Sequence, residues 1–194
     1  MKDPAVIFRQ LPRLTTGRLV LRPLEAGDAE AIFAYARDAQ VARYLSWPTH
    51  RTIEDTRRFL AETLARYAAG RPASWGLELQ VSGRLIGTAG FVNISARESR
   101  GEIGFVLSPE YWGQGLACEA VREIIRYGLT ELGLARVEAR CQVDNLACHR
   151  LLDRCGMIFE RIVEPGPLLA EQLPPFRLYA AGRVESGGGK KTKS

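Results

Sequence analysis

Residues 101–120 join a short strand, a glycine-bearing turn and the start of an amphipathic helix, and this order of elements restricts the fold most. The run 102–107 is apolar except for Glu102 and stops before Pro109, which predicts a buried strand. Further along, apolar residues recur at helical spacing on one face, at Leu116, Ala120, Val121, Ile124, Ile125 and Leu129. The chain therefore belongs to a class in which strands and helices are layered.

The turn between this strand and helix can bind an anion. The first backbone N–H groups of a helix have no partner within it, and the helix dipole adds about half a positive charge there. Gly113 and Gly115 carry no Cβ atoms that would keep phosphate oxygens from those donors. A tight connection with no ligand is the alternative interpretation. The sequence contains neither a P-loop nor a dinucleotide-binding fingerprint followed by an acidic residue.

The turn resembles a known cofactor loop. The window Trp112, Gly113, Gln114, Gly115, Leu116 and Ala117 is similar to the Q/R-x-x-G-x-G/A loop of the GNAT N-acetyltransferases. Trp112 replaces the leading Gln or Arg, as in the RimJ/RimL-like branch, and residues 14–24 (LTTGRLVLRPL) resemble the opening strand of that branch. The resemblance extends from about residue 14 to 181. It implies that acetyl-CoA is the cosubstrate, with its pyrophosphate in this loop.

The pattern of the remaining chain predicts a mixed sheet, mostly antiparallel, with helices on both faces. We expect helices at 28–38, 53–69 and 145–155, a short helical or irregular piece at 41–47, and strands at 18–22, 75–81, 85–93, 136–143, 157–163 and 176–181. The resemblance implies a GNAT fold in which strands 102–107 and 136–143 run parallel and separate at a central V-shaped opening. Pantetheine would lie there, against backbone groups of Phe105, Val106 and Leu107.

Length and charge indicate one soluble domain. We expect a loosely attached arm at 1–13, a single domain at 14–185 and a disordered tail at 186–194 (SGGGKKTKS). The net charge is +5, and the tail contributes three lysines, so residues 1–185 carry 5 − 3 = +2. That charge is too small to predict direct nucleic-acid binding. With no membrane-length apolar run or signal-peptide core, we expect a cytoplasmic protein.

The cysteines do not indicate a metal site. None of Cys118, Cys141, Cys148 and Cys155 forms a CxxC pair, and only His50 and His149 could complement them. We therefore expect reduced thiols and no metal.

A second block, residues 144–157 (DNLACHRLLDRCGM), resembles the second conserved motif of the same family. Asn145 is predicted to cap a helix, to contact the cofactor, or both. Leu152 stands where many family members carry the tyrosine that protonates the departing CoA thiolate. Cys148 is either a small buried thiol or a replacement proton donor.

Glu102 is the candidate general base, because a bare carboxylate in an apolar strand must face a cleft or find a partner. The resemblance favours a base, since several family members place a glutamate here. The alternative is a structural ion pair with a neighbouring arginine such as Arg100.

The acceptor is less defined by the sequence. Tyr44 and Trp47 lie between the first two helices, a region that borders the acceptor cleft in the resembling fold, but aromatic residues there can equally fill the core. The resemblance implies direct acetyl transfer to a primary amine in a ternary complex, favouring a protein N-terminal α-amine of the ribosomal-protein type. A small-molecule amine, or a catalytically silent CoA-binding module, are the alternatives, and a homodimer remains open.

Overall fold

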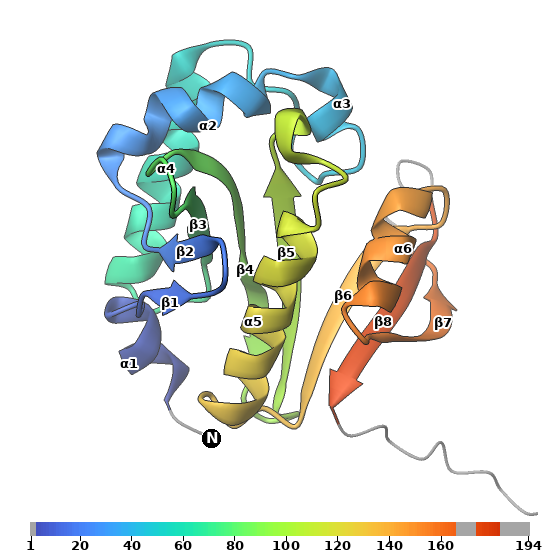
Figure 1. Ribbon diagram of the computed structural model, residues 1–194. Helices are drawn as coiled ribbons and strands as arrows, with labels where there is room; N and C mark the ends of the chain where they lie inside the picture. Colours follow the sequence, from blue (N-terminus) through green and yellow to red (C-terminus); the bar gives the residue numbers. More distant parts are fainter. Residues whose placement is uncertain (1–2, 166–173, 183–194) are drawn as a thin grey trace, which may run out of the picture.

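The computed structural model describes residues 3–165 and 174–182 of the chain. Its elements in order are α1 (Pro4–Arg9), β1 (Leu14–Thr15), β2 (Leu19–Arg22), η1 (Ala26–Asp28), α2 (Ala29–Ala36), α3 (Ala39–Ala42), α4 (Ile53–Ala68), β3 (Ser74–Leu79), β4 (Leu85–Ser95), β5 (Arg100–Leu107), η2 (Pro109–Tyr111), α5 (Leu116–Thr130), β6 (Arg136–Gln142), α6 (Leu146–Arg154), β7 (Ile158–Val163) and β8 (Phe176–Gly182). Figure 1 shows them in one view.

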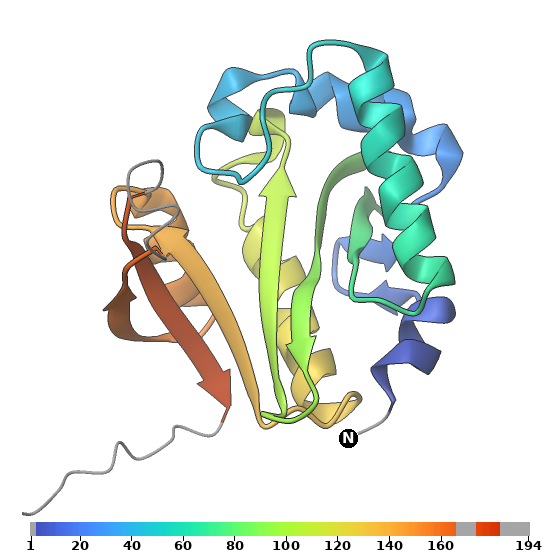
Figure 2. The ribbon, with the colours of Figure 1, turned by 180° about the vertical axis from the view of Figure 1, so that it is seen from behind.

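The eight strands form one sheet in the order β1-β2-β3-β4-β5-β6-β8-β7. Every neighbouring pair is antiparallel except β5 and β6, which are parallel. Helix α5 lies in front of the sheet in Figure 1, whereas α4 comes forward in the view from behind (Figure 2). The prediction of a mixed, mostly antiparallel sheet with helices on both faces is thus confirmed.

The parallel strands β5 and β6 stay paired over only part of their length. Their register runs from Arg100 opposite Arg136 to Ile103 opposite Ala139. Beyond this point β5 pairs with β4 alone and β6 with β8 alone, among the described strands. Figure 2 shows the two strands diverging from that end of the sheet. The predicted separation of the central strands is confirmed.

The N-terminal segment is packed into the core, contrary to the prediction of a loosely attached arm. Asp3 caps α1 by accepting a hydrogen bond from the Ala5 amide (2.9 Å), and Phe8 is fully buried. The Phe8 ring contacts both Trp75 and Phe91, with 6.4 Å between centroids in each case. The prediction failed because one turn of helix is too short to show an apolar period.

Local sequence signals explain the predicted helix boundaries. Thr52 and Asp55 form a reciprocal capping box at the start of α4, and Asn145 Oδ1 accepts from the Cys148 amide (3.1 Å) at the start of α6.

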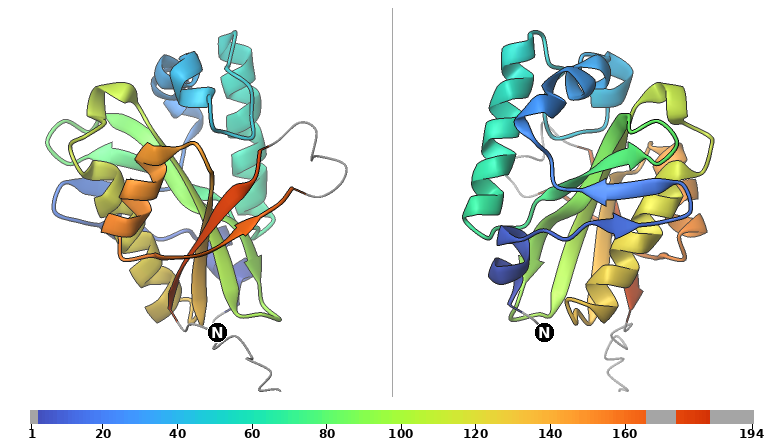
Figure 3. Two further views of the ribbon diagram at one scale, coloured as in Figure 1. Left: turned by 90° about the vertical axis from the view of Figure 1, so that its right-hand side faces the viewer. Right: turned by 60° about the vertical axis from the view of Figure 1, so that its left-hand side comes forward.

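The β1–β2 hairpin lies beside α5, as Figure 3 shows. Within residues 3–165 and 174–182, no helix is long and apolar enough to cross a membrane. The predicted disordered tail lies outside the described residues.

Candidate active site

The turn before α5 presents backbone donors on its open side. Gly113 and Gly115 have φ of 74° and 78°, in the left-handed region that favours glycine. A Cβ on Gly113 would meet no described atom within 4 Å. The first hydrogen bond of the helix runs from the Glu119 amide to the Gly115 carbonyl (3.0 Å). The backbone amides that precede Glu119 therefore have no partner within the helix. This geometry suits an anion, and that role for the turn stays a prediction.

The other residues of the window hold the turn in shape. The half-exposed Trp112 indole donates from Nε1 to the Leu107 carbonyl (2.7 Å), and Gln114 Nε2 donates to the Glu110 carbonyl (2.9 Å). Leu116 is buried in the core at 3% exposure, so only its backbone is available to a ligand. Ala117 is half-buried beside it. These side chains position the loop, leaving ligand contacts to the backbone.

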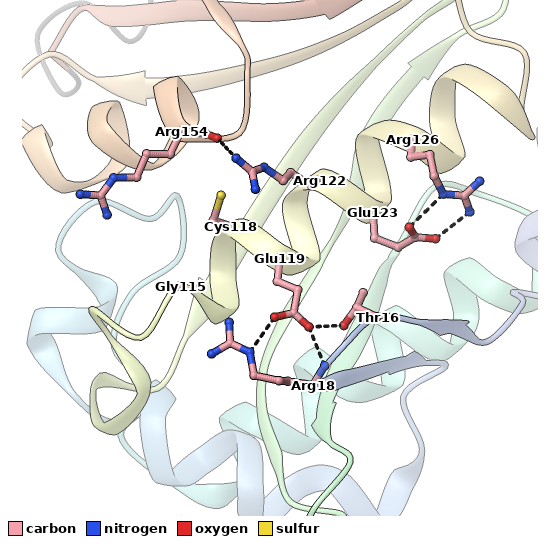
Figure 4. A pocket seen from close by; sticks show the side chains of 9 residues that line it. All are labelled: Thr16, Arg18, Gly115, Cys118, Glu119, Arg122, Glu123, Arg126 and Arg154. Atoms are coloured by element: carbon pink, nitrogen blue, oxygen red, sulfur yellow. Dashed lines mark hydrogen bonds and ion pairs between the residues drawn. The ribbon is translucent and has the colours of Figure 1, made fainter.

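An open cavity of about 690 Å³ begins at this helix start and is shown in Figure 4. It is lined by Thr16, Arg18, Gly115, Cys118, Glu119, Arg122, Glu123, Arg126 and Arg154. Glu119 accepts hydrogen bonds from Thr16 Oγ1 (2.5 Å), the Arg18 amide (2.7 Å) and Arg18 Nε (2.8 Å). Burial alone would raise the pKa of Glu119, but these hydrogen bonds lower it. The cavity wall carries four arginines against two carboxylates, Glu119 and Glu123, each of which is paired with an arginine.

The separation of β5 from β6 exposes strand edges beside the turn. From Gly104 onward, β5 residues pair only with β4 among the described strands. Leu107 is buried and Phe105 and Val106 are half-buried against the core, so a ligand between the strands would meet their backbone. An extended chain can hydrogen-bond to such an edge as an added strand does.

Glu102 lies immediately before the separation. It stands opposite Glu138 in the parallel register, one residue before the last paired position. Its side chain is 19% exposed, and Oε2 lies 3.2 Å from Nη2 of Arg140. Burial raises its pKa above the ordinary value, while the charge of Arg140 lowers it. The alternative prediction of an ion pair with an arginine is met by Arg140 rather than by Arg100, which pairs with Glu98 and Glu138.

The sequence reasoning missed Glu138, a carboxylate with a side chain only 7% exposed. Glu138 accepts hydrogen bonds from Arg100 Nη1 (2.7 Å) and Arg136 Nε (2.8 Å). Arg136 also forms a bidentate salt bridge with Glu160 of β7. The signal for this network was the alternation of charged residues at 136, 138 and 140, which places all three on one face of β6.

Cys148 occupies a packing position on α6. Its thiol interacts with Cys141 of β6, and this interaction together with burial raises the pKa of Cys148 well above its ordinary range. Its neighbour Leu152 is fully buried. The half-buried Cys148 packs against the core, which favours the interpretation of a packing thiol over that of a proton donor. Asn145 is confirmed as the helix cap, and its contact with the cofactor stays a prediction.

Tyr44 and Trp47 follow α3, which lies over the end of the sheet where β5 and β6 diverge in Figures 1 and 2. Trp47 packs against His50, with ring centroids 5.0 Å apart, and lines a second cavity of about 470 Å³. Tyr44 lies beneath the guanidinium of Arg43, 5.0 Å from the ring centroid. Trp47 is partly buried and packs against the core. Acceptor binding by Tyr44 or by Trp47 stays a prediction.

The candidate residues lie on two faces of the sheet. A Cβ on Gly101 would meet Leu134, and one on Gly128 of α5 would meet Val137, so these strand positions face α5. Because side chains alternate along a strand, Glu102 points to the opposite face. A ligand anchored at the α5 turn could reach Glu102 through the separation of the strands. No group of three or more metal-ligating side chains occurs in the described part of the chain.

The acetyltransferase (GNAT) domain model matches residues 18–158. A relative from Bacillus subtilis (strain 168), the uncharacterised N-acetyltransferase YoaA, is 37% identical over 152 residues, covering 78% of this chain and 86% of the relative.

Solved structures share the fold. The crystal structure of an acetyltransferase of the GNAT family from Bacillus anthracis is 28% identical with a TM-score of 0.77, covering 88% of this chain and 98% of the other. RimL, a ribosomal L7/L12 α-N-protein acetyltransferase solved in complex with coenzyme A, is 18% identical with a TM-score of 0.76, covering 88% and 97%. The predicted GNAT fold is thereby confirmed.

Proposed function

The chain belongs to the GNAT acetyltransferase family and is an N-acetyltransferase, and from this premise we propose that it moves the acetyl group of acetyl-CoA to a protein N-terminal α-amine, with Glu102 as the base. The observation that carries the proposal is the position of Glu102 at the point where β5 and β6 separate. The RimL structure, solved with coenzyme A, supports acetyl-CoA as the cosubstrate.

Acetyl transfer needs an anchored thioester and a neutral amine. The backbone donors from Gly113 to Ala117 bind the pyrophosphate, and the free edge of β5 at Phe105, Val106 and Leu107 binds the pantetheine. Asn145, at the start of α6, contacts the same arm. The β5 amides also stabilise the negative charge that develops on the thioester oxygen.

Glu102 accepts the proton that the amine loses, directly or through one water. The amine nitrogen then attacks the thioester carbon, the carbon–sulfur bond breaks, and CoA leaves as a thiolate. A raised pKa makes the carboxylate a stronger base than an exposed glutamate, provided that it is ionised at neutral pH. With leucine at position 152 and the half-buried Cys148 thiol paired with Cys141, solvent supplies the proton to the leaving thiolate.

An α-amine suits this site better than a lysine side chain. Its pKa is near 8, against about 10.4 for lysine, so far more of it is neutral at pH 7. RimL, an α-N-protein acetyltransferase of similar fold, supports the same class of acceptor. A small-molecule amine is the second candidate, since the cavity at Trp47 is only about 470 Å³.

The test is acetyl-CoA turnover, followed by release of free CoA thiol, with a panel of peptides of varied N-terminal residue and a panel of small amines. Each peptide has a matched control with a blocked N-terminus and free lysines. We expect turnover of the peptides with a free N-terminus and none of the controls whose N-terminus is blocked. Turnover of small amines alone would reassign the acceptor, and binding of acetyl-CoA with no turnover of either panel would identify a CoA-binding module.

A further inference from the structure

Two thiols meet at the wall of the cavity beside the cofactor turn. Cys118 lies in the first turn of α5, and Cys155 is the residue that ends α6. Their sulfur atoms are 3.1 Å apart, and Cys155 Sγ also lies 3.7 Å from the Cys118 carbonyl oxygen. In Figure 4 the Cys118 side chain points toward the end of α6 that carries Arg154. Both cysteines are free and half-buried.

The surrounding contacts keep the two sulfur atoms together. One turn beyond Cys118, the Arg122 guanidinium donates a hydrogen bond to the Arg154 carbonyl, which directly precedes Cys155. This hydrogen bond ties the end of α6 to α5 beside the thiol pair. A disulfide bond is about 2.05 Å long, so the sulfur atoms need to approach by only about 1 Å.

We infer that Cys118 and Cys155 form a reversible oxidation site that closes to a disulfide in the presence of a small-molecule disulfide. The Cys118 thiolate attacks one sulfur of the oxidant, which gives a mixed disulfide and releases one thiol. The Cys155 thiolate then attacks Cys118 Sγ and releases the second thiol. Two protein thiols are oxidised and one small disulfide is reduced to two thiols, which take up the two protons that the protein thiols lose.

Cys118 is the thiol that meets the oxidant, because it lines the open cavity. The other pair of neighbouring cysteines, Cys141 and Cys148, is less accessible to an oxidant. Cys141 is only 5% exposed and lies on β6 behind α6. Burial raises the pKa of Cys155, so less of this thiol is ionised and it attacks an external oxidant more slowly. The order of the two steps follows from this difference in access.

The oxidation site and the cofactor turn share one short helical segment. Cys118 lies three residues after Gly115, in the turn whose amides are proposed to hold the pyrophosphate. A bound cofactor covers the cavity wall and places negative charge beside Cys118, so it slows attack on the oxidant. This second part of the inference rests on the proposed function, whereas the disulfide itself does not.

The full chain is oxidised with oxidised glutathione, the remaining thiols are alkylated after denaturation so that the buried Cys141 also reacts, and the intact mass is measured. We expect the oxidised protein to take up two alkyl groups where the reduced protein takes up four, with a peptide map joining the segments that carry Cys118 and Cys155. Cys118→Ser and Cys155→Ser should each abolish the bond, and Cys141→Ala should leave it intact. Because the bond closes a loop of 37 residues, it should raise the Tm by about 5–10 °C until reductant is added.

The disulfide inference is overturned if all four thiols of the wild type stay open to alkylation, if the bond joins Cys141 to Cys148, or if glutathione stays attached to Cys118.

Saturating acetyl-CoA, which has no free thiol, should slow oxidation several-fold. In Gly115→Asp this protection should vanish while oxidation without ligand proceeds. Equal oxidation rates with and without acetyl-CoA in the wild type would refute the coupling and leave the disulfide standing.

Discussion

Replacing Glu102 with glutamine tests the proposed base directly. Glutamine keeps the shape and hydrogen-bonding capacity of the side chain but accepts no proton. A positioned base contributes about 10²–10⁴ in rate, so we expect kcat/KM for the amine to fall by that factor with little change in acetyl-CoA binding. The matched control is Glu98→Gln, which removes a carboxylate of the same region whose side chain is 54% exposed.

The pH dependence gives a sharper test, because the neighbours of Glu102 shift its pKa in opposite directions. Activity requires the carboxylate to be ionised, so kcat/KM falls as the pH drops through its raised pKa. Arg140→Gln removes a charge that lowers this pKa, so the acidic limb should move to higher pH. Glu138→Gln removes a charge that raises it, so the limb should move to lower pH.

The size of the Arg140 effect follows from its exposure. The Arg140 side chain is 42% exposed, and a pair of this kind is worth at most about 1 kcal/mol because water screens it. One pKa unit corresponds to about 1.4 kcal/mol, so the limb should shift upward by no more than about 0.7 pH unit. A shift of two units would mean that the pair is far better shielded than the structure shows.

The assay is CoA-thiol release under limiting amine from pH 5 to 9, with folding of each variant checked by thermal denaturation. In Glu102→Gln the limb of the carboxylate should disappear, leaving only the ionisation of the amine itself. A glutamine variant as active as the parent over the whole range would refute the base assignment. The attacking amine would then arrive already neutral, and Glu102 would serve to hold Arg140 or the acceptor.

Three further outcomes follow from the described contacts. Gly115→Asp should abolish the rise in Tm that acetyl-CoA gives, whereas Gly83→Asp, which places the same side chain at a similar φ of 66° in the β3–β4 hairpin, should keep it. Phe8→Ala should lower the free energy of unfolding in urea by about 3–5 kcal/mol, and the exposed Val6→Ala by less than about 0.5 kcal/mol; equal small effects would restore the loose-arm prediction. Cys148→Ala should keep kcat within about threefold of the parent, since loss of a general acid would cost about 10²-fold or more.

The sequence predicted the fold where local signals were strong. Thr52 and Asn145 marked helix starts because a short polar side chain satisfies free amides there, and both caps are present. The strand before Gly113 and the helix after it were predicted because apolar period and glycine position agreed. Phe8 was missed, since a single aromatic residue in one turn of helix owes its burial to Trp75 and Phe91, which lie far along the chain.

The site was predictable only in part, for a related reason. Glu102 stood out as a lone carboxylate in an apolar strand, but its partner could not be chosen from the sequence. Arg100 is two residues away, whereas Arg140 reaches Glu102 only because β5 and β6 are parallel and in register. Glu138 draws Arg100 away, and this competition depends on the register in which β5 pairs with β6. A local sequence pattern cannot identify ion-pair partners that are brought together by strand pairing.

The arrangement on two faces bears on the order of the reaction. The turn at Gly115 lies beside α5, while Glu102 points to the face on the side of α4, seen in Figure 2. A thioester held at the turn would pass between β5 and β6 to meet Glu102, and the amine would approach from the face that Glu102 occupies. Because the two substrates would arrive from opposite sides, neither would need to leave before the other binds. We therefore infer that transfer is direct within a ternary complex. Initial rates at varied acetyl-CoA and amine should give intersecting reciprocal plots, and parallel plots would instead require an acetylated enzyme intermediate.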